Sequence, residues 1–357
     1  MSTGSDSPED ALPDLGSLIA RAAGEGRLDG ADAEAAFNIV MDGRATPVQI
    51  AALLVAMKAR RETAEEVAGG VRALRRAMIP VAASDPDQLV DTCGTGGGTL
   101  TTFNISTAAA FVAAGAGVRI AKHGNRSFSS RCGSADILEA LDVPIELSPD
   151  GMADVLERAG LVFMFAPLLH PAMRHVAPVR RELRMPTIMN LLGPLTNPAG
   201  ARRQVVGVSD PALLELIAAA LRELGHVHAL VVHGEPGIDE LSPIGATRML
   251  DVREGAITST TVDLRELLPG RDLDPAGLAG GDPVDNARMV LRILRGEAPD
   301  VARAAVTVNA AAAIYVAGLA DSVQSAFDIA EQSIDSGRAR DALDRLRDAA
   351  KAAEPAR

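Results

Sequence analysis

Apolar residues in the first part of the chain recur with the period of a helix and show no strand-like alternation. Thr46-Pro47-Val48-Gln49 is a capping box with proline at the first helical position, and it precedes the apolar run from Ile50 to Met57. Thr63-Ala64-Glu65-Glu66 is a second capping box, opening a helix expected to end near Met78. Earlier helices are expected from Leu15 to Ala23 and from Ala31 to Met41. The pattern predicts a small all-helical domain over residues 1–82.

From Leu89 onward, short runs rich in β-branched residues alternate with helical patterns. The expected strands are Leu89 to Cys93, Val118 to Ala121, Leu161 to Phe165, Gln204 to Val208 and Ala229 to His233. The expected intervening helices are Thr107 to Ala114, Ala135 to Leu141 and Ala212 to Leu224. Because this alternation is typical of βαβ units, we predict a large α/β domain with a mainly parallel sheet flanked by helices.

Two stretches depart from the alternation. His170 to Leu195 is helical, basic and interrupted by prolines, so we assign residues 168–195 to the helical domain. From Asn286 onward, Ala-rich helices are expected to cover the sheet, and the terminal amphipathic run from Ala339 to Ala352 is expected to fray. The α/β domain is therefore predicted to comprise residues 83–167 and 196–357.

The charge of the chain narrows the possible functions. The formal net charge of −12 argues against a nucleic-acid binder, which needs a basic surface. An enzyme for anionic substrates would need local basic clusters, and these exist around Lys122 to Arg131 and around Arg174 to Arg184. The polar, acidic start and the absence of an apolar run of ~18 residues predict a cytoplasmic protein that does not associate with membranes.

Two glycine-containing motifs suggest sites for phosphate. Asp91-Thr92-Cys93-Gly94-Thr95-Gly96-Gly97-Gly98 runs from an expected strand into a glycine loop that precedes a helix, so backbone N–H groups and the helix dipole can face an anion. Lys122-His123-Gly124-Asn125-Arg126 follows the next strand and adds side-chain cations to a loop of small and hydroxyl residues. A structural turn and a solvated polar loop are the alternatives for these two motifs.

Two further motifs carry charges that suit a substrate or a metal. Arg180 lies in the basic segment before the stretch Asn190 to Pro198, where an arginine can pair with a substrate carboxylate. A surface salt-bridge network of Arg180, Arg181 and Glu182 explains it equally well. Asp239 and Glu240 follow the last expected strand, and adjacent carboxylates suit Mg²⁺, whereas a merely solvated acidic pair is the alternative.

These motifs, in this order, resemble those of anthranilate phosphoribosyltransferases, and the resemblance runs from about Leu15 to Val316. It implies a nucleoside phosphorylase/phosphoribosyltransferase-like fold, an active site between the two domains, and a homodimer formed through the helical domain. It also implies transfer of the phosphoribosyl group from phosphoribosyl pyrophosphate to the amine of anthranilate, a step of tryptophan biosynthesis that uses Mg²⁺.

The resemblance assigns roles to individual residues. Phosphoribosyl pyrophosphate would be held by the two glycine-containing loops, at Gly94, Gly97, Gly98, Thr102, Asn104, Ile105, Ser106, Thr107, Lys122, His123, Gly124, Asn125, Arg126, Ser127, Phe128, Ser129, Ser130 and Ser134. Anthranilate would be bound at Gly94, Asn125, His170, Arg180 and Gly193. Mg²⁺ would be held by Ser106, Asp239 and Glu240. No residue is assigned as a general base.

One position departs from the family pattern, because Gly98 stands where the family commonly has Asp. The substitution removes a carboxylate next to the expected pyrophosphate and metal site.

The expected reaction is displacement at the anomeric carbon of the ribose, with an oxocarbenium-like transition state and pyrophosphate as the leaving group. A nucleoside phosphorylase of related fold is a rival, but it should carry a Lys-His-Ser-type loop in place of Lys122-His123-Gly124-Asn125. A non-catalytic nucleic-acid-binding paralogue is a second alternative, against which the charge of −12 and the acidic pair both argue.

Overall fold

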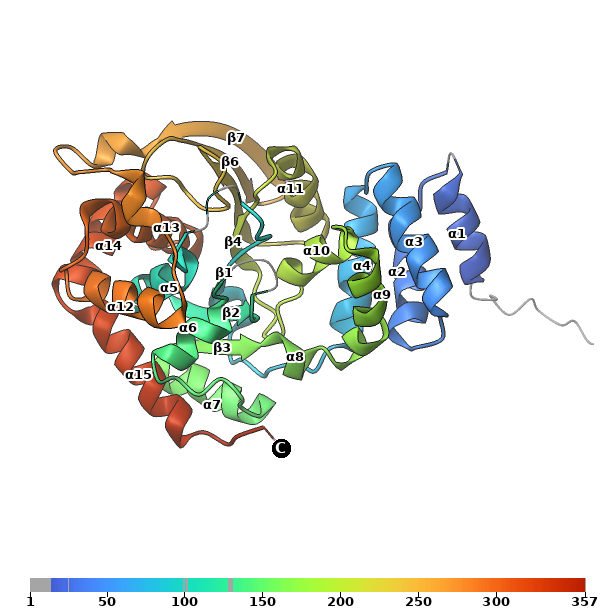
Figure 1. Ribbon diagram of the computed structural model, residues 1–357, viewed down its shortest axis with the longest axis horizontal. Helices are drawn as coiled ribbons and strands as arrows, with labels where there is room; N and C mark the ends of the chain where they lie inside the picture. Colours follow the sequence, from blue (N-terminus) through green and yellow to red (C-terminus); the bar gives the residue numbers. More distant parts are fainter. Residues whose placement is uncertain (1–13, 25, 99, 101, 128–130, 357) are drawn as a thin grey trace, which may run out of the picture. The chain divides into compact units, whose positions relative to one another are not determined.

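The computed structural model describes residues 14–24, 26–98, 100, 102–127 and 131–356. These residues belong to two compact units (Figure 1). Unit 1 comprises Met1–Ala77 and Ala172–Leu192, and unit 2 comprises Met78–Pro171 and Gly193–Arg357.

Unit 1 is entirely helical in its described residues. Its α-helices are α1 (Leu15–Ala23), α2 (Gly30–Met41), α3 (Pro47–Ala59), α4 (Ala64–Ala77), α9 (Ala177–Leu183) and α10 (Ile188–Leu192). Both predicted capping boxes are present: Gln49 N–H donates to Thr46 Oγ1 over 3.3 Å, and Glu66 N–H donates to Thr63 Oγ1 over 3.2 Å. α2 packs along α4, α9 lies against α3, and α10 lies against α4. The predicted helical domain is therefore confirmed.

Unit 2 is built on a seven-stranded sheet with the strand order β3-β2-β1-β4-β5-β6-β7. The strands are β1 (Leu89–Gly94), β2 (Arg119–Gly124), β3 (Leu161–Phe165), β4 (Arg203–Gly207), β5 (His228–Gly234), β6 (Ala246–Arg253) and β7 (Ala256–Asp263). The pairs among β1 to β5 are parallel, and β5–β6 and β6–β7 are antiparallel. The predicted mainly parallel sheet is confirmed, whereas the β6–β7 hairpin was not predicted.

Helices cover this sheet, as expected for an α/β domain. They are α5 (Ile105–Gly115), α6 (Ser134–Ala140), α7 (Pro149–Ala159), α8 (Ala166–Leu169), α11 (Leu214–Glu223), α12 (Pro283–Leu294), α13 (Asp300–Ala317), α14 (Val323–Asp335) and α15 (Arg338–Ala352). α5 packs beside β1 and β2 and is covered by α13, α14 and α15 (Figure 1). α11 follows β4, where the strand order changes direction, so right-handed crossovers put it on the opposite face from α5.

Two helices differ from what the sequence led us to expect. α15 was expected to fray, but Leu343 and Leu346 are buried and the helix packs on α5 and α7. Its apolar face completes the core instead of facing water. α13 has the length and apolar composition of a membrane-crossing helix, although no such run was expected. It is nevertheless 78% buried within the protein, as a core helix is.

Candidate active site

The carboxyl ends of the parallel strands place the predicted motifs along one edge of the sheet. β1, β2, β4 and β5 end there at Gly94, Gly124, Gly207 and Gly234. Strand order reverses between β1 and β4. β2 and β3 are added on one side of β1, and β4 and β5 are added on its other side. A ligand in an α/β sheet usually binds in the crevice at such a reversal.

The acidic loop after β5 lies against the glycine-containing loop after β1. Asp239 Oδ2 accepts a hydrogen bond of 2.9 Å from Gly96 N–H. A Cβ on Gly94 would lie 2.5 Å from Asp239 Oδ2, and one on Gly207 only 1.6 Å from Asp239 O. Glycine is therefore required at both strand ends for Asp239 to approach the loop.

Glu240 lies at the N-terminus of α5. Its Oε1 accepts a hydrogen bond of 3.2 Å from Ser106 N–H, so the carboxylate occupies the position where a helix favours an anion. Burial, and then the neighbouring charge of Asp239, raise the pKa of Glu240 to about 8. Two half-buried carboxylates that repel each other in this way are a fitting pair of ligands for a divalent cation. Among the described residues no group of three or more His, Cys, Asp or Glu side chains gathers, so further ligands would come from substrate, water or the Ser106 hydroxyl.

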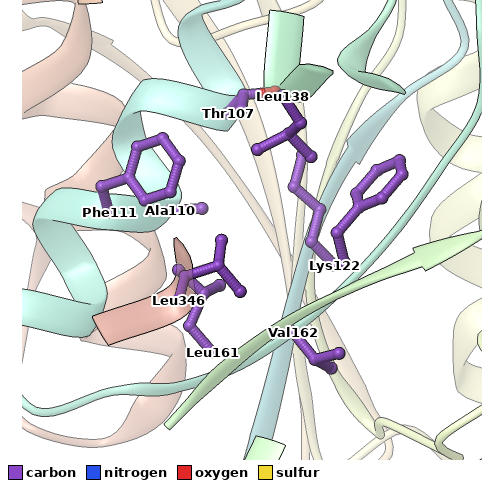
Figure 2. A pocket seen from close by; sticks show the side chains of 9 residues that line it. Thr107, Ala110, Phe111, Lys122, Leu138, Leu161, Val162 and Leu346 are labelled. Carbon is purple, nitrogen blue, oxygen red and sulfur yellow. The ribbon is translucent and has the colours of Figure 1, made fainter. Parts of the chain in front are cut away.

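Lys122 is buried under the α5 face of the sheet, with 4% of its surface exposed. Its Nζ donates to Thr92 O, to Thr92 Oγ1 over 3.3 Å and to Ser106 Oγ over 3.4 Å. Figure 2 shows its aliphatic stem beside a small cavity of about 10 Å³ that Phe111 and Leu346 also line. Lys122 thus places a positive charge behind the N-terminus of α5 instead of presenting it to open solvent.

His123, which follows Lys122, points to the other face of the sheet, as alternation along a strand requires. Its Nε2 lies 3.1 Å from Nε2 of His170. Burial is the main reason that the pKa of His123 falls to about 3 and that of His170 to about 4. A backbone hydrogen bond links His123 to Gly193. His123, His170 and Gly193 therefore form one group, in which both imidazoles are neutral at pH 7.

The loop after β2 is closed at its base by the start of α6. Asn125 O accepts hydrogen bonds of 3.2 Å from Ser134 Oγ and from Ala135 N–H. Arg126 pairs with both oxygens of Glu139, at 2.6 and 2.8 Å, and with Asp136 Oδ1 at 2.9 Å. Its guanidinium also lies over the ring of Phe165, 5.5 Å from the centroid. Arg126 is thus committed to α6 in this structure.

Other predicted residues of the first loop also make internal contacts. Asn104 donates to Cys132 O over 3.2 Å and accepts from Asn286 Nδ2 over 3.1 Å, so it joins both glycine-containing loops to α12. Thr102 forms a bridge to Ala279, and Thr107 is buried in α5. Gly96 and Gly97 have positive φ values of 68° and 82°, whereas Gly98 is not among the glycines with positive φ. Phe128, Ser129 and Ser130 lie outside the described residues.

Arg180 lies in unit 1, on α9. Its Nη2 is 3.4 Å from Asn190 Oδ1, and it makes no ion pair among the described residues. The salt-bridge network that was the alternative explanation for Arg180 is therefore absent from the described part of unit 1.

A buried polar group beneath the strand ends was not predicted from the sequence. Asp91, Asn197 and Gln204 are each at most 2% exposed, and Asn197 and Gln204 both donate to Asp91. Asp91 begins the first glycine-containing motif and Asn197 lies in the Asn190 to Pro198 stretch, but no role was predicted for either residue. A polar residue inside an apolar strand, such as Asp91 between Val90 and Thr92, was the available signal.

Two family models match the chain. The α/β domain of a glycosyl transferase family matches residues 86–340, and the helical bundle domain of the same family matches residues 17–78.

Similar proteins share one name. The anthranilate phosphoribosyltransferase of Rubrobacter xylanophilus is 50% identical over 91% of this chain and 94% of its own length. That of Moorella thermoacetica is 51% identical over 87% of this chain and 91% of its own length. The crystal structure of the Thermus thermophilus enzyme has a TM-score of 0.87 at 42% identity, covering 94% of this chain and 99% of that one. The Saccharomyces cerevisiae enzyme in complex with phosphoribosyl pyrophosphate and Mg has a TM-score of 0.85 at 25% identity, covering 95% of this chain and 98% of that one.

Proposed function

The chain belongs to the anthranilate phosphoribosyltransferase family, and we propose that it transfers the phosphoribosyl group from phosphoribosyl pyrophosphate to the amine of anthranilate. The products are N-(5-phosphoribosyl)anthranilate and pyrophosphate. The observation that carries the proposal is the meeting of the β1, β2 and β5 loops at one edge of the sheet. There the acidic pair accepts N–H groups from the first loop and from α5.

The phosphate groups of the substrate would bind at the N-terminus of α5 and the loop before it. Glycines let backbone N–H groups of this loop approach phosphate oxygens, and the N-terminus of α5 favours their negative charge. The buried charge of Lys122 favours an anion at the same place. The other predicted residues of both loops keep their proposed roles, whereas we assign Arg126 to holding the loop against α6.

Mg²⁺ is the proposed cofactor, held by Asp239 and Glu240 with the Ser106 hydroxyl nearby. When bound, it would neutralise the charge that develops on the departing pyrophosphate. The protein's own part is to hold the two carboxylates together against their repulsion, which the hydrogen bonds from Gly96 and Ser106 do.

Anthranilate would bind on the His123 face of the sheet edge, near His170 and Gly193, with Arg180 pairing with its carboxylate. Both imidazoles are poor bases because of their low pKa values of about 3 and about 4. An aromatic amine is nucleophilic in its neutral form, so the reaction needs no strong base. His123 and His170 would therefore position the ring as neutral hydrogen-bonding groups.

We also propose a cytoplasmic homodimer that associates through unit 1. Light scattering after size-exclusion chromatography measures the dimer directly. The nucleic-acid-binding alternative has no support, since the acidic pair is in place and the net charge is −12.

The test of the function is the loss of anthranilate fluorescence on mixing with the purified protein. The loss should occur only when phosphoribosyl pyrophosphate and Mg²⁺ are both present, and pyrophosphate should appear in equal amount. Arg180→Ala should raise the KM for anthranilate by more than tenfold, as expected for a lost charged pair of about 1.5–3 kcal/mol, with a smaller effect on phosphoribosyl pyrophosphate. No turnover by the parent protein would refute the function, and an unchanged anthranilate KM would refute only the role of Arg180.

A further inference from the structure

The pairing between β1 and β2 stops short of the strand ends. Its register runs only to Val90 opposite Ile120, whereas β1 stays paired with β4 up to Gly94 opposite Gly207. Beyond Val90, the carboxylate of Asp91 accepts the backbone N–H of His123 on Oδ1, at 3.2 Å. A side chain thus takes the place of the backbone ladder where the β1–β2 pairing ends.

The other oxygen of this carboxylate receives two side-chain amides. Asn197 Nδ2 donates to Asp91 Oδ2 over 2.8 Å and also to Ala121 O over 2.9 Å. Gln204 Nε2 lies 3.5 Å from the same Oδ2 and donates to Pro194 O over 2.6 Å. Gln204 therefore ties the residue after Gly193 to the position of Asp91.

Asp91 is fully buried, so an ionised carboxylate there depends on its donors. Those donors connect the two loops that serve different substrates in the proposed function. The backbone N–H of His123 lies at the start of the phosphate loop, and Gln204, on β4, also holds Pro194 O beside Gly193. We propose that Asp91 is a positioning residue that holds the anthranilate loop in register with the phosphate loop. This inference rests on the proposed function.

The isosteric variant Asp91→Asn has an expected direction. Asparagine has one acceptor oxygen, and the backbone N–H of His123 cannot move without displacing β2, so that oxygen should stay with His123. The new NH₂ group then faces the NH₂ groups of Asn197 and Gln204, donor against donor. Gln204 must rotate, and Pro194 O loses its partner. Binding of anthranilate should therefore be weakened more than binding of phosphoribosyl pyrophosphate.

The experiment compares steady-state kinetics and melting temperatures of the full-length parent, Asp91→Asn and Asp251→Asn. Asp251 is the matched control, because its carboxylate also pairs with a buried side chain, His228 at 3.1 Å, and with the Tyr315 hydroxyl at 2.6 Å. It lies on β6 opposite Leu230, away from the strand ends. Gln204→Met is the third variant, which removes the bond to Pro194 O and leaves Asp91 ionisable.

Asp91→Asn should raise the KM for anthranilate about tenfold and lower kcat, with the KM for phosphoribosyl pyrophosphate changed less than about twofold. Gln204→Met should shift the anthranilate KM in the same direction, and Asp251→Asn should shift neither KM. The proposal is overturned if Asp91→Asn behaves like Asp251→Asn, or if both KM values rise equally. If Asp91→Asn does not fold, parent-like kinetics of Gln204→Met overturn it instead. A parent without activity would reject the proposed function and not the role of Asp91.

Discussion

Gly98 sets the number of carboxylates beside the proposed metal site. A Cβ at this position would lie 3.7 Å from Asp239 Oδ1 and 3.0 Å from Gly237 O. Gly98→Asp therefore adds a third carboxylate beside Asp239 and Glu240. Without a cation the acidic pair repels the new carboxylate, and when Mg²⁺ is present the three carboxylates together attract it more strongly. We predict that the Mg²⁺ concentration giving half-maximal activity falls about tenfold, equivalent to ~1.4 kcal/mol, with the anthranilate KM nearly unchanged.

Gly98→Asn is the control for this prediction, because it makes the same steric demand without the charge. The Mg²⁺ concentrations that give half-maximal activity should differ between the two variants. Superimposable activity curves would show that charge at this position has no role. Gly98 does not have a positive φ, so its dihedral angles suit either side chain, and both variants meet the same close contact with Gly237 O.

Arg126 gives a test of positioning against direct substrate binding. Its side chain is 43% exposed and that of Glu139 is 44% exposed, so their pairing is worth at most about 1 kcal/mol. If Arg126 holds the loop against α6, Arg126→Gln and Glu139→Gln should each raise the KM for phosphoribosyl pyrophosphate about three- to fivefold, and the double variant should be no worse than Arg126→Gln. A lower KM in Glu139→Gln would instead mean that Glu139 competes with the substrate for Arg126.

The His123–His170 pair should make the protein less stable in mild acid. Burial depresses both pKa values, to about 3 and about 4 from 6.5, so the unfolded chain binds protons that the folded protein does not. Stability is then complete above about pH 6.5 and falls as the pH drops, by up to about 2 kcal/mol per histidine at pH 5. Urea unfolding of the parent and of His170→Gln at pH 7 and pH 5 measures this, and an equal loss in both proteins would contradict it.

Some site residues could be predicted from local sequence and others could not, and the two groups differ in what brings their side chains together. The glycines of the first loop, Lys122 and the Asp239–Glu240 pair stand beside strand ends, so topology alone brings them together. Asp91 and Gln204 are 113 positions apart, and nothing local to either predicts their contact. The pairing of Arg126 with Asp136 and Glu139 was likewise not predicted. An arginine in an expected phosphate loop was assigned to phosphate, although these carboxylates of α6 also lie within its reach.

Among the elements, helices with capping signals were predictable and the β6–β7 hairpin was not. Thr46 with Gln49 and Thr63 with Glu66 marked two helix starts, and both capping boxes formed. β7 is Thr-rich and largely exposed, so it has no apolar alternation to recognise. The turn residues Glu254 and Gly255 both have positive φ, as a two-residue hairpin turn requires, but Glu-Gly is a weak turn signal.

α15 allows a prediction at the scale of one element. Leu346 is 2% exposed and lines the small cavity beside Lys122 with Phe111, Leu138 and Leu161 (Figure 2). Leu346→Ala should enlarge this cavity and cost about 2–5 kcal/mol of unfolding free energy. Arg345→Ala, at an exposed position of the same helix, should change stability by less than about 0.5 kcal/mol. Equal unfolding midpoints in urea for the two variants would mean that α15 frays, as expected from the sequence alone.

For the whole molecule, the division into units is not a division of the chain into two consecutive pieces. Unit 1 takes residues 172–192 from the middle of unit 2. α9 packs on α3 and α10 on α4, and a Cβ on Gly70 would lie only 2.8 Å from Leu192 Cδ1. The helices of the N-terminal segment are therefore incomplete without this insertion.

This arrangement predicts how fragments behave. A fragment of residues 14–77 should melt at a lower temperature and less cooperatively than the same fragment joined by a flexible linker to residues 172–192. Below about 80 residues a domain has little core to spare, so the loss of two packed helices should be measurable. Far-UV circular dichroism melts of both fragments give the comparison, and identical melts would show that α9 and α10 contribute nothing to unit 1.

The burial of α5 by distant helices has a consequence for synthesis on the ribosome. α5 begins at the proposed phosphate site, yet the helices that cover it, α13, α14 and α15, come far behind it in the chain. Buried residues of α15 extend to Ala350. A growing chain therefore carries its substrate-binding loops without this covering layer until these helices have been synthesised.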